Sequence, residues 1–142
     1  MTWAEQASER LVEAGYKAGG ARRQIVDLLA SEHCAVTALE IDRRLDSVGR
    51  ASVYRTLEQL ESLHLIQRVE IGADAAGFER IDPHGHHHHL VCEECGSLFP
   101  FSSEKLEAAI KAVEREARFK STTHDVVLRG RCPDCASGDG GS

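Results

Sequence analysis

Histidines and cysteines are concentrated in one short internal stretch, which constrains the fold more than any other feature. It reads His84-Gly85-His86-His87-His88-His89-Leu90-Val91-Cys92-Glu93-Glu94-Cys95. Neutral imidazole and thiolate are the commonest protein ligands for zinc and its neighbours in the transition series. The stretch is internal and a second Cys-x-x-Cys pair follows it, which is not typical of an expression tag. It predicts a domain built around bound metal.

The length and the cysteine pattern narrow the class of protein. The 142 residues are enough for one or two small domains. Domains of that size often need a metal or an oligomeric partner for stability. There is no apolar run long enough to span a bilayer, and the charged first segment is unlike a signal peptide. We therefore expect a cytoplasmic protein without a membrane partner.

Two Cys-x-x-Cys pairs predict a structural zinc site. The four residues are Cys92, Cys95, Cys132 and Cys135. In a reducing cytosol such pairs are more readily thiolate ligands than disulfides. Four thiolates complete a tetrahedral zinc site and leave no position for a substrate, so that metal binding stabilises the fold. Free thiols or a redox pair are the alternative, and Cys34 stands apart from both pairs.

The first half of the chain predicts helices followed by a hairpin. Apolar periodicity and capping signals place the helices at residues 2–14, 21–30, 37–45 and 50–63. The strands are expected at residues 65–71 and 78–82, connected by residues 72–77. Helix, turn and helix followed by a two-stranded wing describe a winged helix, which presents one helix to a DNA groove. A helical bundle plus hairpin without a DNA role is the alternative.

The net charge of −6 argues against indiscriminate affinity for nucleic acid but leaves room for a local cationic surface. In the helix at residues 50–63 the buried stripe consists of Val53, Leu57 and Leu60. This stripe leaves Arg50, Ser52 and Arg55 free to face outward. A merely solvated arginine surface is the alternative interpretation.

Three motifs occur in a fixed order along the chain. They are Val48-Gly49-Arg50-Ala51-Ser52-Val53-Tyr54-Arg55-Thr56-Leu57, the histidine run with Leu90-Val91-Cys92-Glu93-Glu94-Cys95-Gly96, and Gly130-Arg131-Cys132-Pro133-Asp134-Cys135. Together they resemble the ferric uptake regulator (Fur) family, over roughly Gly15 to Cys135. The resemblance implies an α+β chain with a winged helix-turn-helix DNA-binding domain at 1–82. A small α/β metal-binding dimerisation domain at 83–136 and a disordered tail at 137–142 would follow.

The resemblance also implies a function. Members of this family are metal-responsive bacterial transcription regulators, most often repressors and not enzymes. A metal-loaded homodimer would bind AT-rich inverted repeats in double-stranded DNA to control metal homeostasis. By the same resemblance Tyr54 would touch bases and Arg55 a phosphate. The remaining implied DNA-binding residues are Ser52, Arg50 and Arg22.

Strand alternation sorts the histidine run into two sets. Successive side chains of a strand point to opposite faces, so His86 and His88 share one face while His87 and His89 share the other. By the family's spacings, one set forms a site within the dimerisation domain with the residues His86, His88, Glu107 and His124. The other set forms the hinge or regulatory site with the residues His33, Glu79, His87 and His89.

The sequence departs from the family pattern near the hinge site. Pro100 stands where many members have a carboxylate, and Asp82, Glu104 or Cys34 could replace a named ligand. Nitrogen and oxygen ligands suit iron, zinc, manganese or nickel about equally, so the effector metal stays open. Three other functions stay open as well: a peroxide-sensing member of the family, a metalloenzyme, and a metal-storage module.

Overall fold

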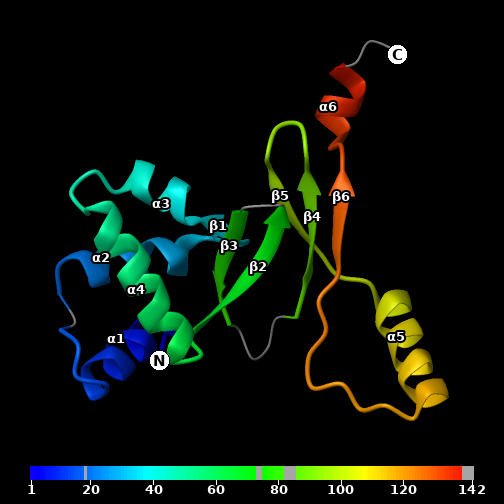
Figure 1. The fold of residues 1–142 in the computed structure, drawn as a ribbon, viewed down its shortest axis with the longest axis horizontal. Helices are drawn as coiled ribbons and strands as arrows, with labels where there is room; N and C mark the ends of the chain where they lie inside the picture. The colour runs from blue at the N-terminus through cyan, green and yellow to red at the C-terminus, as the bar shows by residue number, and fades with distance from the viewer. Residues whose placement is uncertain (18, 73–74, 82–85, 139–142) are drawn as a thin grey trace. The chain divides into compact units, whose positions relative to one another are not determined.

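The computed structural model describes residues 1–17, 19–72, 75–81 and 86–138. The chain forms two compact units, Met1–Gly85 and His86–Ser142. Among the described residues, the first unit contains four helices and a three-stranded sheet, and the other contains a second three-stranded sheet and two helices. The elements are labelled in Figure 1.

The helices of the first unit agree with the predicted ones to within about a residue at each end. They are α1 (Trp3–Glu13), α2 (Ala21–Ser31), α3 (Ala38–Arg44) and α4 (Arg50–Ser62). Thr2 and Glu5 form a reciprocal capping box at the start of α1. The hydroxyl of Thr37 accepts the Glu40 amide at the start of α3, as the capping signal predicts.

The sheet of the first unit is antiparallel with the order β1-β3-β2. Its strands are β1 (Val36–Thr37), β2 (Ile66–Gly72) and β3 (Ala75–Arg80). The predicted strand at 78–82 is wrong at its start, since β3 begins at Ala75 within the small residues assigned to the connector. Backbone pairing with β2 extends the strand there, where the side chains give no alternating signal. Asp82, its predicted end, lies outside the described residues.

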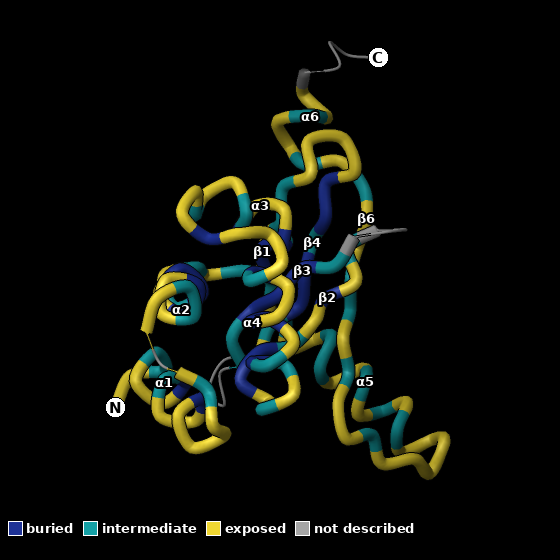
Figure 2. The backbone as a smooth tube through the Cα atoms, turned by 60° about the vertical axis from the view of Figure 1, so that its left-hand side comes forward, coloured by how far each residue is buried: buried dark blue, intermediate teal, exposed yellow. Residues whose placement is uncertain are grey.

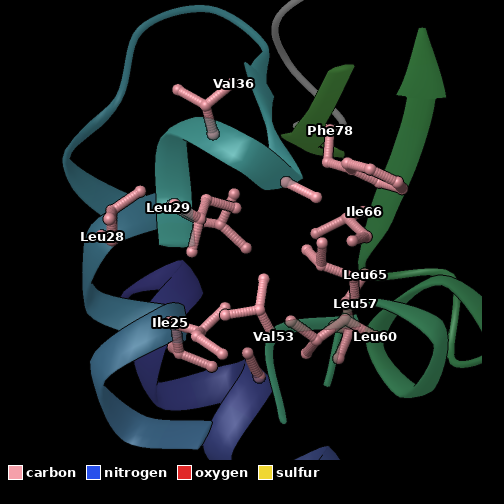
Figure 3. Close-up of a cluster of buried hydrophobic side chains, with 14 of the residues drawn as sticks. Ile25, Leu28, Leu29, Val36, Val53, Leu57, Leu60, Leu65, Ile66 and Phe78 are labelled. Atoms are coloured by element: carbon pink, nitrogen blue, oxygen red, sulfur yellow. The ribbon is translucent and has the colours of Figure 1, made fainter. Parts of the chain in front are cut away.

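One hydrophobic core stabilises the first unit, with side chains from its helices and its sheet (Figure 3). Burial of one such aliphatic or aromatic side chain contributes about 1.5–3 kcal/mol. The predicted stripe of α4 is confirmed, because Val53, Leu57 and Leu60 are buried. The labelled members of the core in Figure 3 are Ile25, Leu28, Leu29, Val36, Val53, Leu57, Leu60, Leu65, Ile66 and Phe78.

Two side chains of α1 hold the turn between α4 and β2. Trp3 Nε1 donates to the Leu65 carbonyl at 3.2 Å, and Arg10 Nη2 donates to the Leu63 carbonyl at 2.8 Å. The Leu63 carbonyl belongs to the C-cap of α4, where the helix itself supplies no partner. The Leu65 carbonyl, just before β2, also accepts the Ile81 amide at 2.9 Å. The two hydrogen bonds from α1 therefore connect this helix to the turn that follows the C-terminal end of α4.

The second unit has a mixed sheet with the order β5-β4-β6. Its elements are β4 (His88–Cys92), β5 (Leu98–Phe101), α5 (Glu104–Ala117), β6 (Val127–Gly130) and α6 (Pro133–Gly138). β4 pairs antiparallel with β5 and parallel with β6, and α5 lies in the crossover between them. The Ser103 hydroxyl caps α5 by accepting the Leu106 amide.

The second unit differs from the sequence analysis in three places. The alternation used to sort the histidines begins at His86, whereas β4 begins at His88, because the pairing with β5 and β6 starts at His88 and His89. The helix α6 extends to Gly138, so the first two residues of the predicted disordered tail are helical; residues 139–142 lie outside the described part. β5 was not predicted, since it is a continuous apolar run that contains Pro100, which an edge strand tolerates.

The second unit buries few of its apolar side chains. α5 has no buried residue, and Figure 2 shows it only as half-buried and exposed. Large apolar side chains stay exposed on β5, α5, the segment after it and β6, namely Phe99, Val113, Phe119 and Leu128. In the part of the chain that the structure describes, no helix has the length and apolarity needed to cross a bilayer.

Candidate metal centres

The structure brings the four predicted cysteines together. Cys92 ends β4, Cys95 lies in the turn after it, and Cys132 and Cys135 lie at the start of α6. The four sulfur atoms are all within 4.8 Å of one another, with Cys95 Sγ 3.8 Å from Cys132 Sγ. Two thiolates of one tetrahedral zinc ion are separated by about 3.8 Å, because each Zn–S bond is about 2.3 Å long. The donor set therefore fits zinc without rearrangement of the backbone.

The electrostatics of the four thiols also favour a bound cation. Cys92 Sγ accepts the amides of Cys95 at 3.4 Å and Cys132 at 3.3 Å, and these bonds lower the pKa of Cys92 to about 6. The Ser97 hydroxyl lies 3.1 Å from Cys95 Sγ and lowers the pKa of Cys95. The adjacent Cys132 sulfur, in contrast, raises the pKa of Cys135. Four thiolates so close repel one another, and a divalent cation removes this cost.

A second group of donor atoms joins β4 to α5 and the segment before β6. His88 Nε2 lies 2.8 Å from Glu107 Oε1, and His124 Nε2 lies 2.7 Å from Glu107 Oε2. His86 Nε2 is 3.1 Å from His124 Nε2, and all four donor atoms lie within 4.8 Å of one another. The hydrogen bond with His88 is the main cause of the lowered pKa of Glu107. Three imidazoles and one carboxylate suit zinc, iron, manganese or nickel.

The histidine run divides as strand alternation predicts. The rings of His86 and His88 are 4.6 Å apart, and those of His87 and His89 are 4.9 Å apart, both edge to face. The sorting holds although His86 and His87 precede β4. His87 and His89 thus form a ring pair separate from the Glu107 group.

Within the first unit, Glu79 of β3 is the best-placed candidate ligand. It is buried, with 5% of its surface exposed, and Gln67 Nε2 donates to its Oε1 at 2.7 Å. Cys34 is half-buried, and its sulfur lies within 4.8 Å of a Glu79 carboxylate oxygen. His33 is exposed and belongs to none of the ligand groups found among residues 1–17, 19–72, 75–81 and 86–138. His84 and Asp82 lie outside those residues.

The outer face of α4 is open. Tyr54 is 51% exposed, so its ring and hydroxyl are accessible rather than packed under the hairpin. Arg55 is exposed, and Ser52 is half-buried. Arg50 is also exposed and pairs with Asp42 at 3.3 Å. Beside Tyr54, a groove of about 470 Å³ runs between α3, α4 and the hairpin.

Arg22 has several partners inside its own unit. Its Nε donates to Gln59 Oε1 on α4 at 2.8 Å, and its Nη1 donates to the Lys17 carbonyl at 3.3 Å. Its guanidinium also lies over the ring of Tyr16, 5.2 Å from the centroid. Arg22 thereby connects the start of α2 to α4.

Comparison with known proteins shows which family combines such a helical unit with groups of candidate metal ligands. The family model described as "Ferric uptake regulator family" matches residues 13–129. The chain belongs to the ferric uptake regulator family. It is a metal-responsive transcription regulator with a winged-helix unit and a C-terminal α/β unit, and its cysteine and His/Glu groups are suited to metal binding.

Individual relatives agree over nearly the whole chain. The chain is 33% identical to the ferric uptake regulation protein of Legionella pneumophila over 135 residues, which cover 92% of this chain and 98% of that protein. The crystal structure of the Vibrio cholerae ferric uptake regulator is 30% identical, has a TM-score of 0.79 and covers 88% of this chain and 98% of its own. The regulator from Pseudomonas aeruginosa, solved with manganese, is also 30% identical, with a TM-score of 0.70 and coverages of 89% and 98%.

Proposed function

We propose that the chain is a cytoplasmic, non-enzymatic repressor that binds AT-rich inverted repeats in double-stranded DNA as a metal-loaded homodimer. The observation that carries this proposal is the two-faced α4. Its apolar stripe is buried in the core, while Tyr54 and Arg55 are presented outward. This is the geometry of a recognition helix beside a wing.

The chemistry of this face suits an AT-rich site. A tyrosine ring packs on the methyl group of thymine, and its hydroxyl can donate to a phosphate. Arg55 and Arg50 would supply the salt-dependent phosphate contacts, with Ser52 as a further hydrogen-bonding group. Because the net charge is −6, affinity must come from this local surface rather than from the whole molecule.

A homodimer is supported by the apolar surface of the second unit. Val113 is 62% exposed and Leu128 is 54% exposed, and Phe99 and Phe119 of the same unit are exposed as well. Exposed apolar surface that is contiguous marks an interaction site. A two-fold dimer pairs identical surfaces, and its symmetry matches an inverted repeat. We propose that the second unit forms this interface, with Ile110 and Val126 beside the exposed pair.

We assign three metal-binding roles. The cysteine group would hold structural zinc, and the group of His86, His88, Glu107 and His124 would hold a second ion within the C-terminal unit. The regulatory ion would take Glu79 from the winged-helix unit together with His87 and His89, with His33 as a fourth ligand, as the family resemblance implies. The support is the buried, oriented Glu79 carboxylate and the separate ring pair of His87 and His89.

Metal would regulate DNA binding by changing the balance between two conformations of the protein. A ligand shifts a conformational equilibrium only when it binds one state more tightly than the other. Bound metal would supply a cross-link between ligands from both units. Glu79 and the two histidines are therefore expected to favour the DNA-competent state only when they share one ion.

The test is operator binding by fluorescence anisotropy with an AT-rich inverted repeat, in titrated metal and in chelator. We expect tight binding only with metal, and weak binding to a single half-site. Tyr54→Ala should weaken binding under all conditions. Glu79→Ala and His89→Ala should abolish the response to metal, and a metal response that persists unweakened in both variants would contradict the regulatory assignment.

A further inference from the structure

The segment between α2 and β1 carries two adjacent candidate ligands, and the structure distinguishes them. His33 is exposed, whereas Cys34 is half-buried. β1 pairs with β3 so that Val36 lies opposite Phe78, and the chain just before β1 therefore runs beside Glu79. The Cys34 sulfur and a Glu79 carboxylate oxygen lie within 4.8 Å of each other.

This separation is suitable for two ligands of one ion. Bond lengths of about 2.3 Å for Zn–S and about 2.1 Å for Zn–O place the two donor atoms of a tetrahedral site about 3.5 Å apart. The two donor atoms, no more than 4.8 Å apart, are therefore close to the spacing that a shared ion needs. The Gln67 amide, 2.7 Å from Glu79 Oε1, fixes the carboxylate in the way that ligating carboxylates are commonly held.

We propose that Cys34, rather than His33, is the ligand that this segment supplies to the regulatory metal, and that this metal is zinc. The inference rests on the proposed function, because it concerns the same regulatory site. A thiolate favours zinc, whereas an all-nitrogen-and-oxygen set leaves iron, manganese and nickel equally suitable. The competing explanation is that Cys34 is a small packed apolar residue, as isolated cysteines commonly are.

Cobalt(II) spectroscopy tests the ligand directly. The full-length protein is prepared with zinc retained in the four-cysteine site, as verified by metal analysis, and is titrated with cobalt(II). We expect a thiolate-to-cobalt charge-transfer band in the near ultraviolet for the wild type and for His33→Ala, and loss of that band in Cys34→Ser. A band of equal intensity in Cys34→Ser would show that the signal comes from the other cysteines and would overturn the proposal.

Zinc affinity provides the second measurement. In competition with a chromogenic chelator, Cys34→Ser should lose at least about tenfold in affinity at the regulatory site, and His33→Ala should not. Thermal unfolding of both variants controls for misfolding, which would move the whole transition rather than the zinc affinity alone. An affinity loss in His33→Ala with none in Cys34→Ser overturns the assignment.

Operator binding separates this inference from the proposed function. If Glu79→Ala loses the metal response while Cys34→Ser keeps the wild-type response to zinc, the regulatory site stands and the role of Cys34 is refuted. If Glu79→Ala, His89→Ala and Cys34→Ser all keep the response, both proposals fail. Loss of the zinc response in Glu79→Ala and Cys34→Ser, with His33→Ala unaffected, is the result that we expect.

Discussion

Arg118 terminates α5 in the left-handed conformation, with φ of 53°. The Phe119 amide donates to the Glu114 carbonyl and the Arg118 amide to the Arg115 carbonyl, which together form a Schellman motif. Glycine is preferred at this position because a Cβ atom costs about 1–2 kcal/mol there.

Arg118→Gly should therefore raise the free energy of unfolding by about 0.5–1 kcal/mol, since part of the relieved strain is offset by the greater freedom of glycine in the unfolded chain. Urea denaturation measures the change. Arg118→Ala serves as the control because it removes the same side chain and keeps the strain. Equal stability of the two variants would show that the left-handed backbone is not the cause.

Gly77 is required by close packing rather than by its backbone angles. A Cβ at this position would lie 2.7 Å from Ile71 Cδ1 and 2.9 Å from Ala35 Cβ. Gly77→Ala should lower the free energy of unfolding by about 1–3 kcal/mol, as overpacked core positions do. Gly130→Ala is the matched control, since a Cβ there meets nothing within 4 Å. Thermal melts of both variants decide whether the clash is accommodated.

At the scale of elements, Glu107 links α5 to the histidines of the second unit. Its pKa is lowered from the usual 4.5, first by the hydrogen bond with His88. A lowered folded-state pKa stabilises the protein at pH values above 4.5, and this stabilisation is lost as the pH falls through the folded-state pKa. The wild type should thus exceed Glu107→Gln in stability at neutral pH.

The gap between these two proteins should shrink steadily as the pH is lowered below 4.5. Chemical denaturation without added metal, at a series of pH values, gives the difference directly. Only pH values at which metal analysis finds the cysteine group of both proteins still loaded with zinc are compared, because zinc loss would unfold the unit that holds Glu107. A gap that does not change with pH would mean that Glu107 contributes by packing alone.

Arg22 shows how a contact between elements changes the interpretation of a residue. Its bonds to Gln59 and Lys17 indicate that it positions α4, whereas sequence resemblance implies a phosphate contact. Arg22→Ala should weaken operator binding without changing the slope of log affinity against log salt. Arg55→Ala should reduce that slope by about 1, since it removes a phosphate contact. A reduced slope in Arg22→Ala would restore the phosphate role.

For the whole molecule, the two units differ in what stabilises them. The hydrophobic cluster found among the described residues lies entirely in the first unit, while the buried side chains of the second are mainly candidate ligands and their neighbours: His88, His89, Val91 and Cys92. Structural zinc contributes on the order of 10 kcal/mol in small zinc domains. The second unit should depend on its metal for folding, and the first should not.

Chelation under reducing conditions should therefore remove hydrogen-exchange protection from β4 and β6 while α2 and α4 stay protected. Mass spectrometry of the exchanged protein measures both units in one experiment. Cys95→Ser should reproduce the effect of the chelator, and Cys34→Ser should not. Protected β4 amides in the metal-free protein would show that packing or dimerisation suffices.

Sequence patterns predicted the elements whose signal is local. The buried stripe of α4 and the Thr37 cap depend on side chains within a few residues of one another, and both agree with the structure. The spacing of the cysteine pairs likewise anticipated which four sulfur atoms meet. The alternation of side chains also divided the four histidines into the correct two pairs, although His86 and His87 precede the strand β4.

Only the tertiary structure decided the features that depend on partners distant in sequence. β1 and the start of β3 exist because backbone groups pair across the sheet, which their side chains do not signal. Cys34, just before β1, lies beside Glu79, while its neighbour His33 is exposed. The sequence by itself determined the ligand types and the family, whereas chain pairing determined which adjacent ligand faces the carboxylate.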